Sequence, residues 1–258
     1  MAASNNWTKV QLRLAFHLYC QLPFGRLHSR TPEIVHLAAQ INRTPSAVAM
    51  KLVNIASLDP AIRQSGRAGL GNASVLDRAV WDEFHQNWDT TVSAVLETMP
   101  DDEKINDEVQ NLELNETVDY SGVSVPAIVL QRRKQSFFRK AVLASYQSRC
   151  CMSGVSEPKL LIASHIVPWK IDEKNRLNPR NGLCLSALHD KAFDQGLLGL
   201  NDDLTIVISS QLKKSKDVFT ASHLITLEGQ PIQLPERFSP DMSLIQWHRA
   251  NVFDHAEN

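Results

Sequence analysis

The chain has 258 residues, which is enough for two domains or for one domain with a helper module. Its 27 Lys and Arg residues nearly balance its 28 Asp and Glu residues, and the formal net charge of −1 excludes a protein that is basic along its whole length. Four cysteines make no disulfide framework, no apolar run approaches the ~18 residues of a membrane span, and no signal peptide opens the chain, so we expect a cytoplasmic protein.

The first elements predicted are helices. Residues 7–20 place apolar side chains among polar ones at helical spacing, and Pro23 and Gly25 interrupt the pattern. Thr31 and Pro32 then mark the start of a second helix, and Pro45 opens a third after a short polar turn at residues 42–44. Two short helices joined by such a turn are similar to the helix-turn-helix of bacterial DNA-binding proteins.

In that interpretation the third helix enters the major groove of DNA and the turn lies near phosphates. The residues predicted to face DNA are Arg43, Thr44, Ser46, Ala47, Met50, Lys51 and Asn54. The alternative is a small helical bundle that only packs or dimerises, because helix-turn-helix look-alikes are common.

The next stretch ends the helical module and begins a linker. Residues 66–71 are rich in glycine and predict a loop, and residues 74–88 predict a further helix. We place the helical DNA-recognition module at 1–97 and an acidic linker at 98–126. Residues 101–119 contain eight acids and one Lys, so the rest of the chain carries a net charge of +6.

A basic helix opens the third part, residues 127–258. Its apolar side is predicted to be buried, and residues 132–151 contain no acid. The basic residues of this strip are Arg132, Arg133, Lys134, Arg139, Lys140 and Arg149. A strip of positive charge can bind phosphates, although a solvated helix face explains any single one of these residues equally well.

The most informative stretch runs from Leu160 to Gly196. It reads LLIASHIVPW, then a polar loop, then NGLCLSALHDKAFDQG, which predicts a β-hairpin followed by a helix that Gly196 closes. A histidine at the end of a strand is more often structural than functional when it stands alone. The ordered set of SHIVP, Asn181 and His189 is different, because a packed core does not need this grouping of polar residues.

This set resembles the signature of the HNH nucleases, whose ββα-metal fold carries DHxxP, Asn and His at these places. The resemblance covers roughly Gln135–Phe253 and implies hydrolysis of a phosphodiester with a divalent cation, expected to be Mg²⁺, with Mn²⁺ or another ion as the alternative. His165 is the expected general base, since a neutral imidazole accepts a proton near pH 7, and His189 is the expected metal ligand. By the resemblance, Asn181 holds the His165 ring and the hairpin loop in place.

The chain departs from the family pattern at two points. Ser164 stands where many members have an Asp or His ligand, so the missing ligand is expected from Asp190, from Asp194, or from water and the substrate phosphate. Many members also brace the motif with zinc held by two CxxC pairs, which this chain lacks. We therefore expect no structural zinc, and we expect Cys151 and Cys184 to be small core residues.

After the motif, residues 203–209 and 224–235 predict strands and residues 239–253 predict a capped helix. The sequence thus predicts an α+β protein with a helical N-terminal module and a C-terminal ββα-metal domain. It indicates a metal-dependent endonuclease acting on double-stranded DNA, with the restriction or anti-phage role that the family suggests. The sequence leaves open whether the enzyme senses DNA modification. A homodimer is one way for such an enzyme to cut both strands.

Two alternatives are compatible with the sequence. A DNA-binding regulator with an inactive HNH domain would bind DNA without cutting it, and Ser164 keeps this alternative open. A structural protein that uses the helical module for partner binding would show no salt-dependent affinity for DNA.

Overall fold

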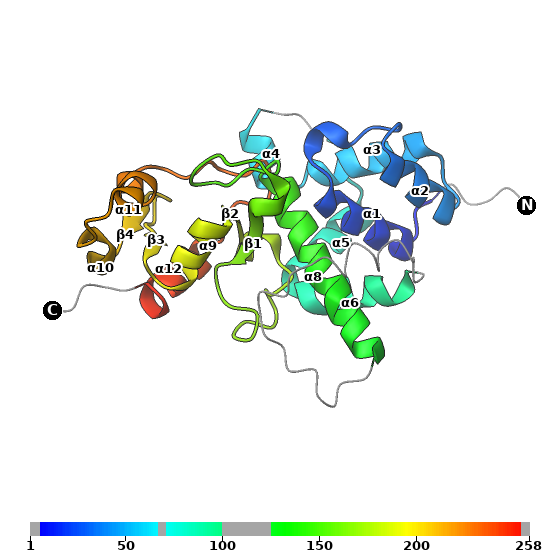
Figure 1. The fold of residues 1–258 in the computed structure, drawn as a ribbon. Helices are drawn as coiled ribbons and strands as arrows, with labels where there is room; N and C mark the ends of the chain where they lie inside the picture. Colours follow the sequence, from blue (N-terminus) through cyan, green and yellow to red (C-terminus); the bar gives the residue numbers. More distant parts are fainter. Residues whose placement is uncertain (1–5, 67–70, 100–124, 254–258) are drawn as a thin grey trace, which may run out of the picture. The chain divides into compact units, whose positions relative to one another are not determined.

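The computed structural model describes residues 6–66, 71–99 and 125–253 (Figure 1). Two compact units, Met1–Ala141 and Val142–Asn258, divide the chain inside helix α8 (Val125–Ser145). The predicted start of the nuclease domain, residue 127, lies near the beginning of this helix, and the division between the two compact units lies further along it. The predicted linker at 98–126 lies mostly outside the described residues. No described helix is both long enough and apolar enough to cross a membrane.

The N-terminal unit is helical, as the sequence predicts. Its elements in chain order are α1 (Lys9–Gln21), η1 (Phe24–Arg26), α2 (Pro32–Gln40), α3 (Pro45–Ala56), α4 (Pro60–Gln64), α5 (Val75–Gln86), α6 (Trp88–Thr98) and the first part of α8. The predicted helix over 74–88 ends at Gln86, because Asn87 adopts an extended backbone and its side chain caps α6. Phe16 lies in the core with its ring centroid 4.1 Å from that of Phe84.

Helices α2 and α3 pack against each other across the predicted turn. Asn42 makes the turn possible with a φ of 53°, a left-handed conformation that Asn tolerates better than most residues. Thr44 caps α3 by accepting a hydrogen bond from the Ala47 backbone amide. Two helices joined by a short turn are thus present, and both their assignment as a helix-turn-helix and their contact with DNA stay predictions.

The C-terminal unit contains two small antiparallel sheets and the helices that cover them. After α8 the elements are η2 (Pro158–Leu160), β1 (Leu161–His165), η3 (Pro179–Asn181), β2 (Gly182–Ser186), α9 (Ala187–Asp194), β3 (Leu198–Leu200), β4 (Ile206–Ile208), α10 (Ser210–Lys213), α11 (Val218–His223), η4 (Ile225–Leu227) and α12 (Met242–Asn251). The predicted α+β class and the predicted hairpin followed by a helix are confirmed.

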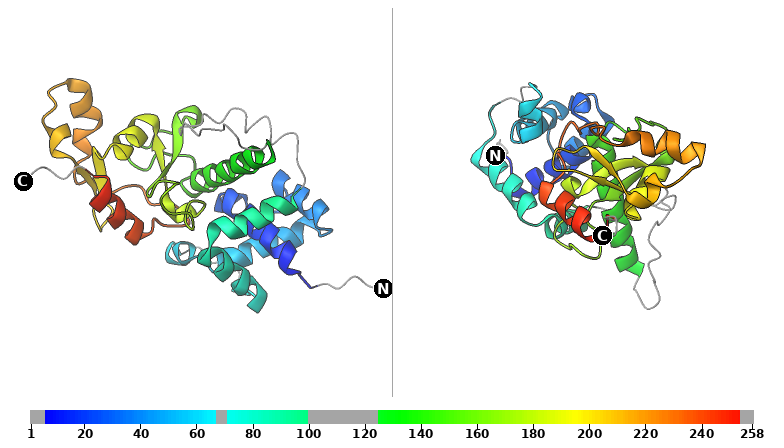
Figure 2. Two further views of the ribbon diagram at one scale, coloured as in Figure 1. Left: turned by 90° about the horizontal axis from the view of Figure 1, so that it is seen from below. Right: turned by 90° about the vertical axis from the view of Figure 1, so that its left-hand side faces the viewer.

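Strands β1 and β2 pair with Leu161 opposite Ser186 and His165 opposite Gly182, and α9 packs on both strands (Figure 1). The second sheet pairs β3 with β4, and α12 lies beside β3 (Figure 2). The strand predicted over 203–209 is β4. The strand predicted over 224–235 is wrong: this segment forms η4 and a single bridge between Thr205 and Pro231.

Candidate active site on the hairpin and its helix

The hairpin brings the ends of β1 and β2 together, and with them the first two motif residues. His165 is the last residue of β1, and Asn181 immediately precedes β2. The Ile166 backbone amide donates to the Asn181 carbonyl at 2.9 Å, which closes the base of the loop between the strands. The residues that were 16 positions apart in the sequence are therefore neighbours in the fold.

His165 is half-buried, and its environment selects one tautomer. Its Nε2 lies 2.9 Å from the Arg176 carbonyl oxygen, which can only accept, so Nε2 carries the proton and Nδ1 carries the lone pair. Burial lowers the pKa of His165 to about 4, although the Arg176 carbonyl acts in the opposite direction. At neutral pH this imidazole is uncharged and able to accept a proton.

The buried Asn181 amide holds the loop between the strands. Its Oδ1 accepts from the Val167 amide at 2.8 Å, and its Nδ2 donates to the carbonyls of Val167 at 3.1 Å and Asn175 at 3.3 Å. An amide can satisfy both kinds of backbone group without adding charge. Asn181 thus bonds to backbone groups at two points of the loop, and the His165 ring donates to the Arg176 carbonyl.

His189 lies in the first turn of α9, which Ser186 caps. Its Nδ1 is 2.7 Å from the Ser186 hydroxyl and 3.7 Å from the Cys150 sulfur. Its Nε2 is buried and has no hydrogen-bond partner among the described residues. A buried ring nitrogen without a partner is costly unless it binds something else, and a divalent cation is a suitable occupant.

The other predicted ligands are less well gathered. Ser164 and Asp190 are both buried, and the serine hydroxyl lowers the pKa of Asp190 against the larger effect of burial, which raises it. Asp194 is exposed at the end of α9. Within residues 6–66, 71–99 and 125–253, no group of three or more His, Cys, Asp or Glu side chains is arranged to hold a metal ion.

Sequence reasoning missed Cys150 as a neighbour of the site. All four cysteines are buried free thiols, and Cys151 and Cys184 are core residues as predicted. Burial raises the pKa of Cys150, but hydrogen bonds with His189, Ser153 and the nearby backbone outweigh it and lower the pKa to about 6. Its position just before the motif was the only signal in the sequence.

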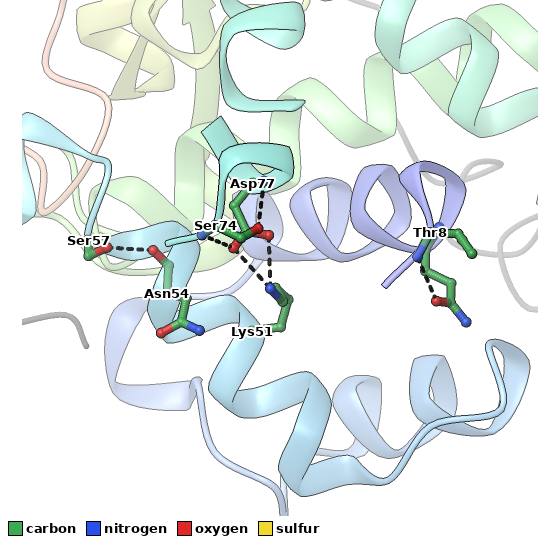
Figure 3. Close-up of polar contacts among 7 residues, drawn as sticks. Thr8, Lys51, Asn54, Ser57, Ser74 and Asp77 are labelled. Carbon is green, nitrogen blue, oxygen red and sulfur yellow. Dashed lines mark hydrogen bonds and ion pairs between the residues drawn. The ribbon is translucent and has the colours of Figure 1, made fainter. Parts of the chain in front are cut away.

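Two residues predicted to read DNA from α3 are unavailable for that role. Lys51 is only 8% exposed, and its ammonium lies 2.9 Å from both carboxylate oxygens of Asp77 (Figure 3). Asn54 is 9% exposed on the inner side of the same helix. Burial contradicts the predicted DNA contact of both residues. The Lys51 ammonium is paired with Asp77, and the Asn54 side chain is almost fully covered, so neither can reach a base edge.

The remaining predicted contacts of this module differ in exposure. Thr44 and Ser46 are exposed, while Arg43 is half-buried beside the Trp7 ring at 5.1 Å and donates to Gln11 at 3.2 Å. Among the polar residues predicted to contact DNA from this module, Thr44 and Ser46 are therefore the exposed ones.

The basic strip on α8 is only partly exposed. Arg132, Arg133, Lys134 and Arg139 are half-buried, and Lys140 is exposed. Lys134 forms an ion pair with Asp89 at 3.1 Å, with both side chains less than a fifth exposed. A lysine that already neutralises a carboxylate contributes less to phosphate binding, so the strip holds less available charge than the sequence suggests.

Comparison with known proteins finds a family model that matches the hairpin and its helix. Residues 150–201 match the family model described as HNH endonuclease. Among solved structures, a modification dependent TagI restriction endonuclease is similar with a TM-score of 0.33 and 22% sequence identity. The similarity covers 45% of this chain and 37% of that chain. No curated protein matches the chain.

Proposed function

We propose, from the match of residues 150–201 to the HNH endonuclease family model, that the chain is a metal-dependent endonuclease that hydrolyses phosphodiester bonds in double-stranded DNA. The observation that carries this proposal is the state of His165 inside the matched region. Its Nε2–H donates a hydrogen bond to the Arg176 carbonyl, so Nδ1 carries the lone pair that can accept a proton at neutral pH.

The reaction needs one proton acceptor and a means to stabilise negative charge. A water oxygen attacks phosphorus as His165 Nδ1 takes the water proton, and the bond from phosphorus to the departing sugar oxygen breaks. That oxygen then takes a proton from solvent, so atoms and charge balance. Asn181 keeps the loop in register, because it bonds Val167 on one side and Asn175 on the other.

The residues present fit a divalent cation bound by few protein ligands. A bound cation would neutralise charge that develops on the phosphate oxygens. His189 Nε2 is the buried nitrogen that would bind it, and Asp190 is the nearest carboxylate along α9. Mg²⁺ commonly keeps several waters and binds through one or two carboxylates and substrate phosphates, so a three-residue cluster is not required. Imidazole ligation suits Zn²⁺, Fe²⁺ and Ni²⁺ better than Mg²⁺, so the identity of the bound ion does not follow from His189 alone.

Cleavage of supercoiled plasmid tests the proposal. Purified protein is incubated with unmodified and cytosine-methylated plasmid in Mg²⁺, Mn²⁺ or EDTA, and His165→Ala is compared with His223→Ala, which alters an exposed histidine of the same unit. We expect metal-dependent nicking that His165→Ala loses and His223→Ala keeps. A restriction or anti-phage role predicts in addition that the two plasmids differ in cleavage rate.

The second candidate is a DNA-binding regulator with an inactive HNH domain. Ser164 favours it, since a hydroxyl, a poor metal ligand, stands where many members supply an Asp or His ligand. A wild-type protein that shifts the mobility of every plasmid but nicks none of them in any metal would favour this regulator over the enzyme. Protein that neither binds nor nicks DNA would contradict both functions.

A further inference from the structure

Arg176 lies in the loop between β1 and β2, and it is linked to the candidate base directly through its backbone and indirectly through Trp169. Its carbonyl oxygen accepts the hydrogen bond from His165 Nε2 at 2.9 Å. Its guanidinium carbon lies 5.5 Å from the centroid of the Trp169 ring, and the same ring lies 5.6 Å from the His165 ring at an interplanar angle of 88°. Trp169 therefore contacts both the His165 ring and the Arg176 guanidinium.

The loop that holds Arg176 is ordered by polar residues at every third position. The Asp172 carboxylate accepts from the backbone amide of Asn175 at 3.2 Å and from its side chain at 2.7 Å. Asn178 donates to the Asn175 side chain at 3.0 Å, and Asn181 donates to the Asn175 carbonyl at 3.3 Å. These bonds fix the backbone on both sides of Arg176 and thus limit where its side chain can go.

Phosphodiester hydrolysis places growing negative charge on the phosphate oxygens, so positive charge is needed near His165. Ser164 supplies none, and among the described residues no three acidic, thiol or imidazole groups converge on a metal position. Arginine remains charged at all working pH values, and its planar fork of N–H donors matches two phosphate oxygens. A guanidinium already held on an aromatic face loses less freedom when it binds.

We propose that Arg176 is a catalytic residue whose guanidinium, held by Trp169, binds the scissile phosphate beside His165. This inference rests on the proposed nuclease function and deepens it. Arg176 donates to the non-bridging oxygens and stabilises the charge that grows on them, while its carbonyl fixes the proton on His165 Nε2. Trp169 is a positioning residue, because it acts through the two side chains that it contacts.

Substitution of the side chain alone separates these roles, since every variant keeps the backbone carbonyl. Arg176→Met removes the charge, Arg176→Lys keeps a charge without the fork, and Lys174→Met is the matched control from an exposed position in the same loop. Single-turnover nicking of supercoiled plasmid is measured for each, and plasmid affinity is measured in a His165→Ala background. Thermal unfolding of each variant reports on folding.

We expect Arg176→Met to nick at least about 100-fold more slowly, with plasmid affinity changed by less than about threefold, because the lost donor acts on charge that develops during reaction. Arg176→Lys should recover part of the rate, and Lys174→Met should match the wild type. Guanidinium ion at about 50 mM should increase the rate of Arg176→Ala, whereas sodium chloride at equal ionic strength should not.

Arg176→Met that nicks within about threefold of the wild type would overturn this inference and leave the nuclease proposal intact. A slow but folded Arg176→Ala that guanidinium fails to restore would also overturn it, and so would an equal loss in Lys174→Met. If Arg176→Met does not fold, Arg176→Lys decides: a wild-type rate in that variant overturns the need for the fork. A wild-type protein that never nicks would refute the nuclease function itself.

Discussion

Replacing His248 with glutamine should weaken the dependence of stability on pH in the C-terminal unit. His248 is 3% exposed, and its ring stacks on Phe193 with centroids 3.7 Å apart and an interplanar angle of 9°. Its Nε2 donates to the Phe193 carbonyl at 3.1 Å. Burial lowers the pKa of His248 from 6.5 to about 4, although the bond to that carbonyl acts to raise it.

The size of this pH dependence follows from the protons that His248 binds in the folded and in the unfolded state. Between pH 7.5 and 5 the unfolded chain protonates His248 almost fully and the folded unit hardly protonates it. Because the unfolded state binds more protons, stability is complete above the unfolded pKa of 6.5 and falls as the pH drops toward the folded pKa of about 4. The loss at pH 5 is about 2 kcal/mol for this one histidine.

Glutamine does not titrate, so His248→Gln should lack this loss. At pH 7.5 the variant should be less stable by about 1 kcal/mol, because it retains a donor for the Phe193 carbonyl but loses the ring contact. By pH 5 the difference should reverse, with the variant more stable than the wild type by about 1 kcal/mol. Urea denaturation of the full chain at four pH values, followed by circular dichroism and tryptophan fluorescence, measures this change.

The comparison with the wild type removes the contribution of other groups that titrate in both proteins, including His165. A difference in free energy of unfolding that stays constant within about 0.5 kcal/mol from pH 7.5 to 5 would refute the reasoning, because it would mean that His248 takes up protons equally in both states.

Three further predictions concern the same structure. Asn181→Ala should lower the free energy of unfolding by about 2 kcal/mol, because the buried Val167 amide loses its acceptor; an unchanged urea midpoint would contradict this. Lys51→Met should cost about 3–5 kcal/mol by leaving Asp77 charged and buried, and Lys51→Met with Asp77→Asn should recover most of it; an equal deficit in both would contradict the ion-pair argument. The acid limb of the cleavage rate should lie nearer pH 4 than 6.5, since burial lowers the pKa of His165 to about 4, and a limb centred at 6.5 would exclude His165 as the titrating base.

The order of strands, loop and helix at the site could be predicted from the sequence, because residues that are neighbours in the chain indicate each element. A strand that ends in His165, a polar loop, a strand that follows Asn181 and a helix that carries His189 are each indicated by neighbouring residues. The partners of these side chains could not be predicted. The Arg176 carbonyl and the Val167 amide are backbone groups, which every residue possesses, so no residue type marks them.

The wrong strand over 224–235 has a local cause as well. Its β-branched residues favour a strand, but Gly229 has a φ of 71° and Pro231 has no amide hydrogen to donate. The segment still follows the second sheet, since the Ile206 amide donates to the Gln230 carbonyl and the Gly229 amide donates to the Ile206 carbonyl. Backbone pairing between this segment and β4 therefore begins and ends within a few residues.

Lys51 shows why the DNA-facing side of a helix is harder to predict than the helix. Its apolar neighbours in α3 mark the buried face correctly, and a lysine beside that face is ordinarily solvated. Its partner Asp77 lies 26 residues further along, where it also caps α5 by accepting from the Ser74 amide (Figure 3). No periodicity within α3 contains that information.

The burial of Lys51 changes what α3 could offer to DNA. Each lysine that neutralises a phosphate releases counterions and steepens the dependence of affinity on salt, and Lys51 is already neutralised by Asp77. The exposed side of α3 instead carries Ser46 and Met50, the latter 57% exposed. These side chains can contact base edges or a thymine methyl group but add no charge. Contact through α3 would therefore contribute to sequence choice more than to affinity, and the phosphate contacts would have to come from other basic residues of the chain.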